Sequence, residues 1–290
     1  MDPLTIGMLS VLAIVVLVYL GLYIPVALGL VSFLSIWIMS GKSILAFNFL
    51  KIVVGDGVTE YNFATIPLFT LMGLLVSKAR LGRDIYDVMN SVFRKVLAGI
   101  GMATVGANAI FAAITGSSIA SASVFTKISV PEMLRYNYNK RFAVGVVAGS
   151  SVLGMIIPPS AMLIIYSFVA EQSVGDMFLA GIIPGLILTA VYIVAIFVMA
   201  RVWPSYVGEN ISAEELPAME RGEMIRKAWP VLALILLVLG GIYTGWLTPV
   251  EAGAAGASLA LIVALVRRSM SRAEFWETLV ETGHITAAIL

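Results

Sequence analysis

The feature that most constrains this chain is a run of 36 residues, from Leu4 to Met39, that contains no charged side chain. A helix needs roughly 20 apolar residues to cross about 30 Å of hydrocarbon, so this run is too long for one span. Gly21 and Pro25 interrupt it and predict two short helices that meet near residues 22–24. Of the 290 residues, 60% are hydrophobic and 12% are charged, whereas a soluble domain carries about 25% charged residues. We therefore expect an all-α integral membrane protein.

The composition also excludes several kinds of chemistry. The chain has no cysteine and one histidine, His284, which rules out disulfides, thiol nucleophiles and a multi-histidine metal centre. Its net charge of +1 gives no basis for nucleic-acid binding. No basic segment precedes the first apolar run, so we do not expect a cleaved signal peptide. The partner that the composition predicts is the lipid bilayer.

Other apolar stretches predict membrane helices at residues 64–77, 142–170, 177–200, 228–246 and 249–266. Two stretches mix charged and apolar residues at helical spacing, at 80–95 and 271–281, and the second leads into an apolar tail at 285–290. We expect both to be amphipathic helices in the membrane interface, with their charged sides facing solvent and headgroups.

A helical hairpin is predicted over residues 98–130, which hold a single charge, Lys127, in 33 residues. Two comfortable crossings would need about 40 residues plus a turn. The small polar turn Thr115-Gly116-Ser117-Ser118 lies in the middle. We therefore predict a re-entrant hairpin whose tip stops near the bilayer midplane, with two thin, tilted spans as the alternative. Lys127 lies near one end of the hairpin, where its side chain can extend to the interface.

The distribution of basic residues predicts the orientation. With this arrangement of spans, fifteen of the 18 Lys and Arg residues lie on the side of the hairpin's flanks, and only Lys42 and Lys51 lie on the other. Cytoplasmic loops carry an excess of Lys and Arg. We therefore expect the hairpin to open toward the cytoplasm and the amino terminus to lie outside.

A break is predicted in the uncharged segment 142–170, at Gly154-Met-Ile-Ile-Pro-Pro-Ser160. Proline has no amide hydrogen, so Pro158 and Pro159 leave the carbonyls of Gly154 and Met155 without their helical donors. In hydrocarbon such carbonyls must face a cavity, a polar neighbour or a cation. The alternative is a simple proline kink among small residues that pack closely.

A broken helix beside a hairpin tip offers carbonyls and hydroxyls to a hard cation, and amide-lined helix ends to an anion. The hydroxyl candidates are Ser117, Ser118 and Ser121 on the hairpin, and Ser150, Ser151 and Ser160 around the break.

A weak internal repeat, of the kind found in many secondary transporters, is also present. Pro25-Val-Ala-Leu-Gly29 is similar to Pro249-Val-Glu-Ala-Gly253, and an odd number of crossings between the two would make the second copy inverted. Chance similarity between short helix starts is the alternative. Glu251 follows Pro249 at a helix start, where we expect it to cap the helix and not to couple an ion.

Several segments together resemble the large membrane subunit, DctM type, of tripartite ATP-independent periplasmic (TRAP) transporters. They are ATIPLFTLMG at 64–73, GSSIAS at 116–121, KISVPEM at 127–133, GMIIPPS at 154–160 and GIYTGWLTPVEA at 241–252. The resemblance runs through nearly the whole chain. It implies an inverted-repeat, elevator-type fold. It also implies sodium-driven uptake of organic acids, such as C4-dicarboxylates or sialic acids.

The resemblance divides the chain into six parts. They are scaffold helices of a first repeat (1–63), a membrane helix with an amphipathic arm helix (64–97), the re-entrant hairpin of a transport domain (98–130), a broken helix and following span of that domain (131–202), a cytoplasmic linker (203–227) and the start of a second repeat (228–290).

Carried over by position, the resemblance assigns roles to the two loops. The expected sodium-binding residues are Gly116, Ser117, Ser118, Gly154, Met155 and Pro158, and the expected substrate-binding residues are Ser118, Ser121, Pro159 and Ser160. We expect no catalytic residue and no cofactor besides sodium as the coupling ion. Some relatives carry an acidic residue where Ser121 stands, so no ion-coupling carboxylate is assigned here.

The resemblance also implies partners and a location. They are a four-helix small membrane subunit, a periplasmic binding protein that delivers an anionic substrate, and the bacterial inner membrane, with the amino terminus periplasmic. Family members continue into a second hairpin and a second broken helix, whereas this chain ends within residues 285–290. We therefore expect a fragment or a truncated product, with an incomplete second repeat.

Two other functions are compatible with parts of the sequence. A non-transporting scaffold subunit is compatible with the length. An intramembrane serine protease is suggested by buried serines and one histidine, but no Gly-x-Ser-Gly stands at a helix start and His284 lies far along the chain. We therefore expect a carrier and not an enzyme.

Overall fold

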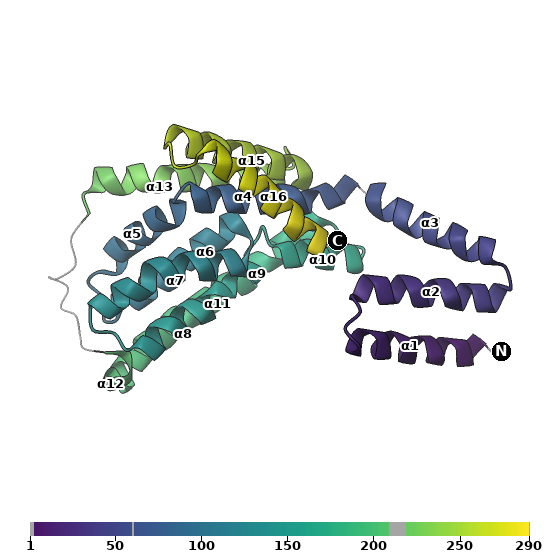
Figure 1. The fold of residues 1–290 in the computed structure, drawn as a ribbon. Helices are drawn as coiled ribbons and strands as arrows, with labels where there is room; N and C mark the ends of the chain where they lie inside the picture. The colour runs from purple at the N-terminus through teal and green to yellow at the C-terminus, as the bar shows by residue number, and fades with distance from the viewer. Residues whose placement is uncertain (1–2, 60, 209–218, 290) are drawn as a thin grey trace. The chain divides into compact units, whose positions relative to one another are not determined.

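The computed structural model describes residues 3–59, 61–208 and 219–289, and the regular structure in these ranges is helical. The expected all-α class is confirmed for this part of the chain. The chain divides into two compact units, Met1–Phe63 and Ala64–Leu290 (Figure 1). Part of the expected linker, residues 209–218, lies outside the described residues, as does the last residue of the expected apolar tail.

The first unit contains α1 (Pro3–Tyr19), α2 (Ile24–Ser40) and α3 (Ser43–Thr59). The predicted break between the first two helices is confirmed. The hydroxyls of Ser10 and Ser35 join α1 to α2 at 2.7 Å, and the rings of Phe33 and Phe47 join α2 to α3 edge to face at 5.0 Å. α3 was not among the predicted helices, because Lys51 and Asp56 interrupt its apolar residues.

The second unit begins at Ala64, the last residue of a short 3-10 turn at Tyr61–Ala64. Its first half contains α4 (Thr65–Lys78), α5 (Leu81–Phe93), α6 (Gly99–Thr115), α7 (Ser118–Arg135), α8 (Lys140–Ser151), α9 (Leu153–Ile156) and α10 (Ala161–Val169). Its second half contains α11 (Val174–Val202), α12 (Pro204–Val207), α13 (Arg221–Ile235), a π-helical turn (Leu236–Gly240), α14 (Gly241–Tyr243), α15 (Pro249–Val266) and α16 (Arg272–Ile289).

Three helices in the described ranges are long and apolar enough to cross a membrane: Val174–Val202, Arg221–Tyr243 and Pro249–Val266. The pair Lys140–Ile156 and Ala161–Val169, bent by 42°, passes the same test when taken together. These helices indicate a multi-pass membrane protein. Three details differ from the expectation: the span predicted at 228–246 belongs to a helix that begins at Arg221, α7 continues past residue 130, and α16 runs through the predicted apolar tail as one helix.

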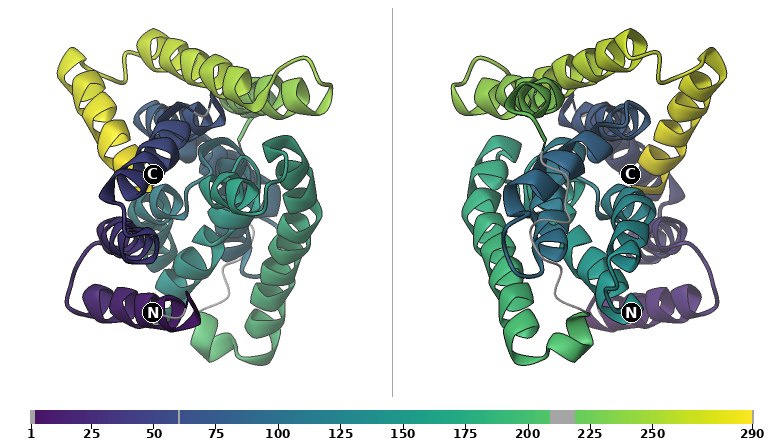
Figure 2. Two further views of the ribbon diagram at one scale, coloured as in Figure 1. Left: turned by 90° about the vertical axis from the view of Figure 1, so that its right-hand side faces the viewer. Right: turned by 90° about the vertical axis from the view of Figure 1, so that its left-hand side faces the viewer.

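α6 is the central helix of the second unit, in contact with α5, α7, α8 and α11 (Figures 1 and 2). Small residues allow this close packing: a Cβ on Gly106 would collide with Met89 of α5, and one on Gly101 would lie 3.3 Å from Ile196 of α11. Phe111 of α6 packs edge to face on Phe125 of α7 at 5.5 Å. The two arms of the hairpin are therefore held by side-chain packing along their length.

α15 and α16, coloured yellow-green and yellow in Figure 2, pack against α4. α15 begins with a capping box, in which the Glu251 amide donates to Thr248 Oγ1 at 3.3 Å and the Glu251 carboxylate accepts from the Thr248 amide at 2.8 Å. The capping role predicted for Glu251 is confirmed. Lys127 lies exposed on α7, as the interfacial interpretation requires.

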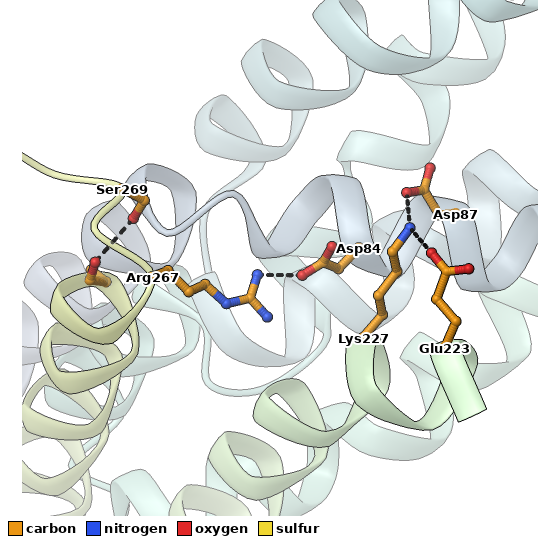
Figure 3. Close-up of polar contacts among 7 residues, drawn as sticks. Asp84, Asp87, Glu223, Lys227, Arg267 and Ser269 are labelled. Atoms are coloured by element: carbon orange, nitrogen blue, oxygen red, sulfur yellow. Dashed lines mark hydrogen bonds and ion pairs between the residues drawn. The ribbon is translucent and has the colours of Figure 1, made fainter. Parts of the chain in front are cut away.

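Ion pairs join α5 to the second half of this unit (Figure 3). Asp84 pairs with Arg267 at the end of α15. Asp87 accepts from Lys227 of α13 at 2.7 Å, and Lys227 also lies 3.2 Å from Glu223. The side chains of Asp84 and Asp87 are 16% and 28% exposed. The expectation that the charged side of this amphipathic helix faces solvent and headgroups is therefore wrong for these two carboxylates, because cations from helices far along the chain cover them.

The Asp87–Lys227 pair should contribute measurably to stability. We expect Lys227→Met to lower the free energy of unfolding by about 1 kcal/mol, and the coupling energy in a cycle with Asp87→Leu to be about 0.5–1 kcal/mol, since both groups are partly buried. The measurement is denaturant unfolding of the purified protein in detergent. The matched control is Lys78–Glu277, which joins α4 to α16 at 3.5 Å with Glu277 68% exposed, and whose coupling should be near zero. Equal coupling in the two pairs would contradict this assignment.

Candidate functional site

The hairpin tip is a two-residue turn between α6 and α7. Gly116 ends α6 in the left-handed region, with φ of +59°, and its amide donates to the Ala112 carbonyl at 3.0 Å. A residue with a side chain is strained in this conformation, which favours glycine. Ser117 is extended, and its hydroxyl accepts from the Ala120 amide at 3.3 Å, so it caps the start of α7. The predicted helix–turn–helix is confirmed, while its re-entrant depth in the bilayer stays a prediction.

The broken helix consists of α8 and α9 before the break and α10 after it. The last bond before the break runs from the Ile157 amide to the Leu153 carbonyl at 2.8 Å, and Ile157 is extended. Pro158 and Pro159, which have no amide hydrogen, occupy the gap and are joined by a cis peptide bond. Ser160 caps α10 by accepting from the Leu163 amide at 3.5 Å. The predicted break is confirmed at the predicted residues.

The two breaks lie directly against each other. The Ala161 amide at the start of α10 donates to the Gly116 carbonyl at the hairpin tip, at 3.3 Å. A Cβ added to Gly154 would lie 2.7 Å from the Ser117 carbonyl carbon and 2.8 Å from the Ser118 amide nitrogen. A Cβ on Gly116 would collide with the Pro159 carbonyl oxygen. Backbone therefore meets backbone at two points, each made possible by a glycine.

The structure brings together most of the residues expected at the site. Gly116, Gly154, Pro158, Pro159 and Ser160 are buried, and Ser117 and Ser118 are partly buried at the tip. The Met155 side chain is 39% exposed, so only its main chain can serve the site. Two further hydroxyl candidates, Ser121 and Ser151, are buried on α7 and α8, and the Ser121 hydroxyl makes no hydrogen bond in the described part of the chain.

One of the three surroundings expected for the carbonyls at the break, a polar neighbour, is found at Met155. The Met155 carbonyl does have a donor, because the Ser160 hydroxyl donates to it at 2.7 Å. Ser160 therefore replaces the amide that Pro159 cannot supply, and one lone pair of the Met155 oxygen remains open. The Gly154 carbonyl is the one that loses its helical donor to Pro158.

Helix ends set the electrostatics of the site. α7 and α10 begin there, at Ser118 and Ala161, and the amides of a helix start carry partial positive charge. α6 ends there at Thr115 with partial negative charge. No group of three or more His, Cys, Asp or Glu side chains gathers in the described ranges. Main-chain dipoles and hydroxyls are therefore the groups available for an alkali cation or an anion.

Glycines that the sequence analysis did not single out hold the neighbouring helices against these loops. On α11, a Cβ at Gly181 would lie 2.6 Å from the Ile156 carbonyl oxygen, and one at Gly185 would lie 2.6 Å from Ile157. On α4, a Cβ at Gly73 would lie 2.8 Å from the Thr115 carbonyl oxygen. The four-residue spacing of Gly181 and Gly185 is the signal that could have indicated a close helix contact.

Comparison with known proteins decides the family. A family model described as "Tripartite ATP-independent periplasmic transporter, DctM component" matches residues 11–290. The chain belongs to the DctM family of TRAP transporter components. It is 35% identical over 232 residues to the C4-dicarboxylate TRAP transporter large permease protein DctM of Pseudomonas aeruginosa, covering 78% of this chain and 52% of that protein. It is 30% identical over 228 residues to the sialic acid TRAP transporter large permease protein SiaM of Vibrio cholerae, covering 77% and 52%.

The resemblance predicted from the five sequence segments is thus confirmed. The DctM family is one of transporter components, which favours transport over proteolysis and over a scaffold role. The chain spans about half the length of the curated relatives it matches. Membership of the DctM family is established, and the apolar helices indicate a multi-pass membrane protein.

The contact between Gly154 and the hairpin tip should not tolerate a methyl group. We expect Gly154→Ala to lower the free energy of unfolding by about 1–3 kcal/mol, since the nearest atoms belong to backbone that cannot rotate away. Gly145→Ala is the matched control on the first half of the same broken helix, where nothing lies within 4 Å of an added Cβ. It should be neutral or slightly stabilising. Denaturant unfolding in detergent is the measurement, and equal effects of the two changes would contradict the contact.

Proposed function

We propose that this chain is the membrane-embedded core of a sodium-coupled TRAP permease that imports organic acids by an elevator movement. The observation that carries the proposal is the contact of the two breaks, Gly116 with Ala161 and Gly154 with residues 117–118. Two interrupted helices that meet inside a membrane protein are the arrangement by which secondary transporters bind a cation beside an anionic substrate.

The proposed sodium site uses main-chain oxygens of the two loops. Its residues are Gly116, Ser117 and Ser118 at the tip, and Gly154, Met155 and Pro158 at the break. The Gly154 carbonyl, which has no helical donor, is the first candidate ligand, and the open lone pair of the Met155 carbonyl is the second. A cation bound here would hold the tip and the break together and so complete the pocket for the substrate.

The proposed substrate site lies beside it, at the starts of α7 and α10. A carboxylate would interact favourably with the partial positive charge at both helix starts. The residues proposed to line this space are Ser118, Ser121, Pro159 and Ser160. The names of relatives, which include C4-dicarboxylate and sialic acid permeases, support an organic acid as the substrate.

The remaining parts of the proposal concern the assembly. We propose a small four-helix membrane subunit and a periplasmic binding protein as partners, in the bacterial inner membrane, with the amino terminus periplasmic. The hairpin and broken helix would move as the transport domain against scaffold and arm helices of an inverted repeat. Each sodium charge that moves inward beyond compensation would supply about 2.3 kcal/mol per 100 mV of membrane potential.

Restoring an amide hydrogen at the break should weaken the sodium site. In Pro158→Ala, the new amide can bond the Gly154 carbonyl and remove it as a ligand, so the sodium concentration for half-maximal uptake should rise about tenfold. The measurement is uptake in proteoliposomes, using the natural gene product that contains this chain with its partners. Pro230→Ala is the matched control, since Pro230 lies inside α13, which packs mainly on α5 and the π-helical turn. Unchanged sodium dependence in Pro158→Ala, with normal membrane insertion, would refute the site.

The orientation can be tested independently, because the chain has no native cysteine. Single cysteines in place of Lys42 and Lys140 should face opposite sides of the membrane. An impermeant maleimide added to intact spheroplasts should label Lys42→Cys and should leave Lys140→Cys unlabelled until the membrane is opened. Labelling of both from the outside, or the reverse pattern, would contradict the proposed orientation.

A further inference from the structure

A polar link joins the hairpin to the broken helix one to two helical turns before the two loops. The side-chain amide of Asn108 on α6 donates from Nδ2 to the Ser150 hydroxyl on α8, at 2.6 Å. Ser150 in turn donates to the Val146 carbonyl of its own helix at 2.7 Å. Asn108 is 0% and Ser150 is 1% exposed. The link is therefore a chain of two hydrogen bonds in the interior that connects the two elements of the proposed site.

Its position places it close to both breaks. Asn108 precedes Gly116 by two helical turns, and Ser150 precedes Gly154 by one. The link consequently fixes the spacing of α6 and α8 just before each helix reaches its loop. A change in this spacing would be transmitted to the tip and to the Gly154 carbonyl along rigid helices.

Packing alone does not account for an asparagine at this position. The Asn108 side-chain oxygen is buried and has no hydrogen-bond partner in the described part of the chain. An unpaired buried oxygen is unfavourable, and a leucine of similar size would avoid it. By contrast, the buried hydroxyls of Thr104 and Thr115 on the same helix donate to carbonyls of α6 itself, those of Ile100 and Phe111. Asn108 therefore contributes a directional bond between two helices at the expense of stability.

We infer that Asn108 is a positioning residue that sets the separation of the hairpin and the broken helix and thereby the geometry of the cation site. This inference rests on the proposed sodium site, and it concerns a residue that touches neither the ion nor the substrate. Asn108 acts through Ser150, whose helix ends at the break. Loss of the Asn108 side chain should change the sodium dependence of uptake more than it changes the free energy of unfolding.

The test compares Asn108→Leu and Ser150→Ala with Thr104→Val, a buried change one turn away on α6 that removes a hydroxyl bonded to the Ile100 carbonyl of its own helix. In proteoliposomes containing the natural gene product, the first two variants should raise the sodium concentration for half-maximal uptake about tenfold, and Thr104→Val should leave it unchanged. Asn108→Leu should unfold no more readily than the parent protein. Unchanged sodium dependence in both linking variants would overturn the inference, and if Asn108→Leu fails to insert, Ser150→Ala decides.

A distance measurement tests the link without transport. Ile119 and Met162 are 82% and 50% exposed. Spin labels attached to Ile119→Cys and Met162→Cys report the distance between the hairpin and the break by double electron–electron resonance spectroscopy. In sodium-free buffer the distance distribution should broaden in Asn108→Leu, and it should narrow again in the exchanged pair Asn108→Ser with Ser150→Asn. An identical distribution in parent and Asn108→Leu would overturn the inference. A parent protein that responds to sodium in neither assay would refute the proposed function instead. The comparison of parent and Asn108→Leu in sodium-free buffer would still test whether Asn108 sets the distance between the hairpin and the break.

Discussion

The structure around the proposed site depends on the direct contact of two main chains, made where Gly154 faces Ser117 and Ser118. No side chain separates the hairpin tip from the broken helix there. Gly116 makes the same approach possible from the other side, and its carbonyl accepts the first free amide of α10. The two loops thus satisfy part of each other's backbone hydrogen bonding, which a lipid environment cannot do.

This contact explains why the surrounding helices look as they do. α11 approaches the break through Gly181 and Gly185, and α4 approaches the tip through Gly73, so small residues recur wherever a helix lies near these loops. Ser160 replaces a missing amide at the Met155 carbonyl. The Gly154 carbonyl remains as the group for which the fold supplies no helical donor, and this is the physical reason for proposing a cation there.

The sequence predicted the features that depend on local chemistry. Two consecutive prolines in an uncharged segment favour a break in the helix over a simple kink, and a small polar turn in the middle of 33 residues predicts a hairpin. The capping role of Glu251 was also predicted, although its partner Thr248 was not. That the tip and the break would meet was expected because transporters pair such interruptions, and the contacts of Gly116 and Gly154 confirm it.

Other features could not be predicted because they depend on partners distant in the sequence. Asp84 and Arg267 are 183 residues apart, so the local sequence around Asp84 indicated a solvated carboxylate. Asn108 and Ser150 are 42 residues apart, so the local sequence around Asn108 indicated no hydrogen-bond partner. The α3 helix was missed for a different reason. A search for about 20 consecutive apolar residues does not find it, because charged residues interrupt the apolar run. That length is required only of a helix that crosses the bilayer by itself.

The most direct test of the central claim is whether sodium stabilises the folded protein. A ligand that binds only the folded state at 100 times its dissociation constant adds about 2.7 kcal/mol to the free energy of unfolding. Thermal unfolding of the purified natural gene product should therefore occur at a higher temperature in sodium chloride than in potassium chloride of equal ionic strength. Identical unfolding temperatures in the two salts, at all concentrations up to those that support uptake, would contradict a sodium site between the two breaks.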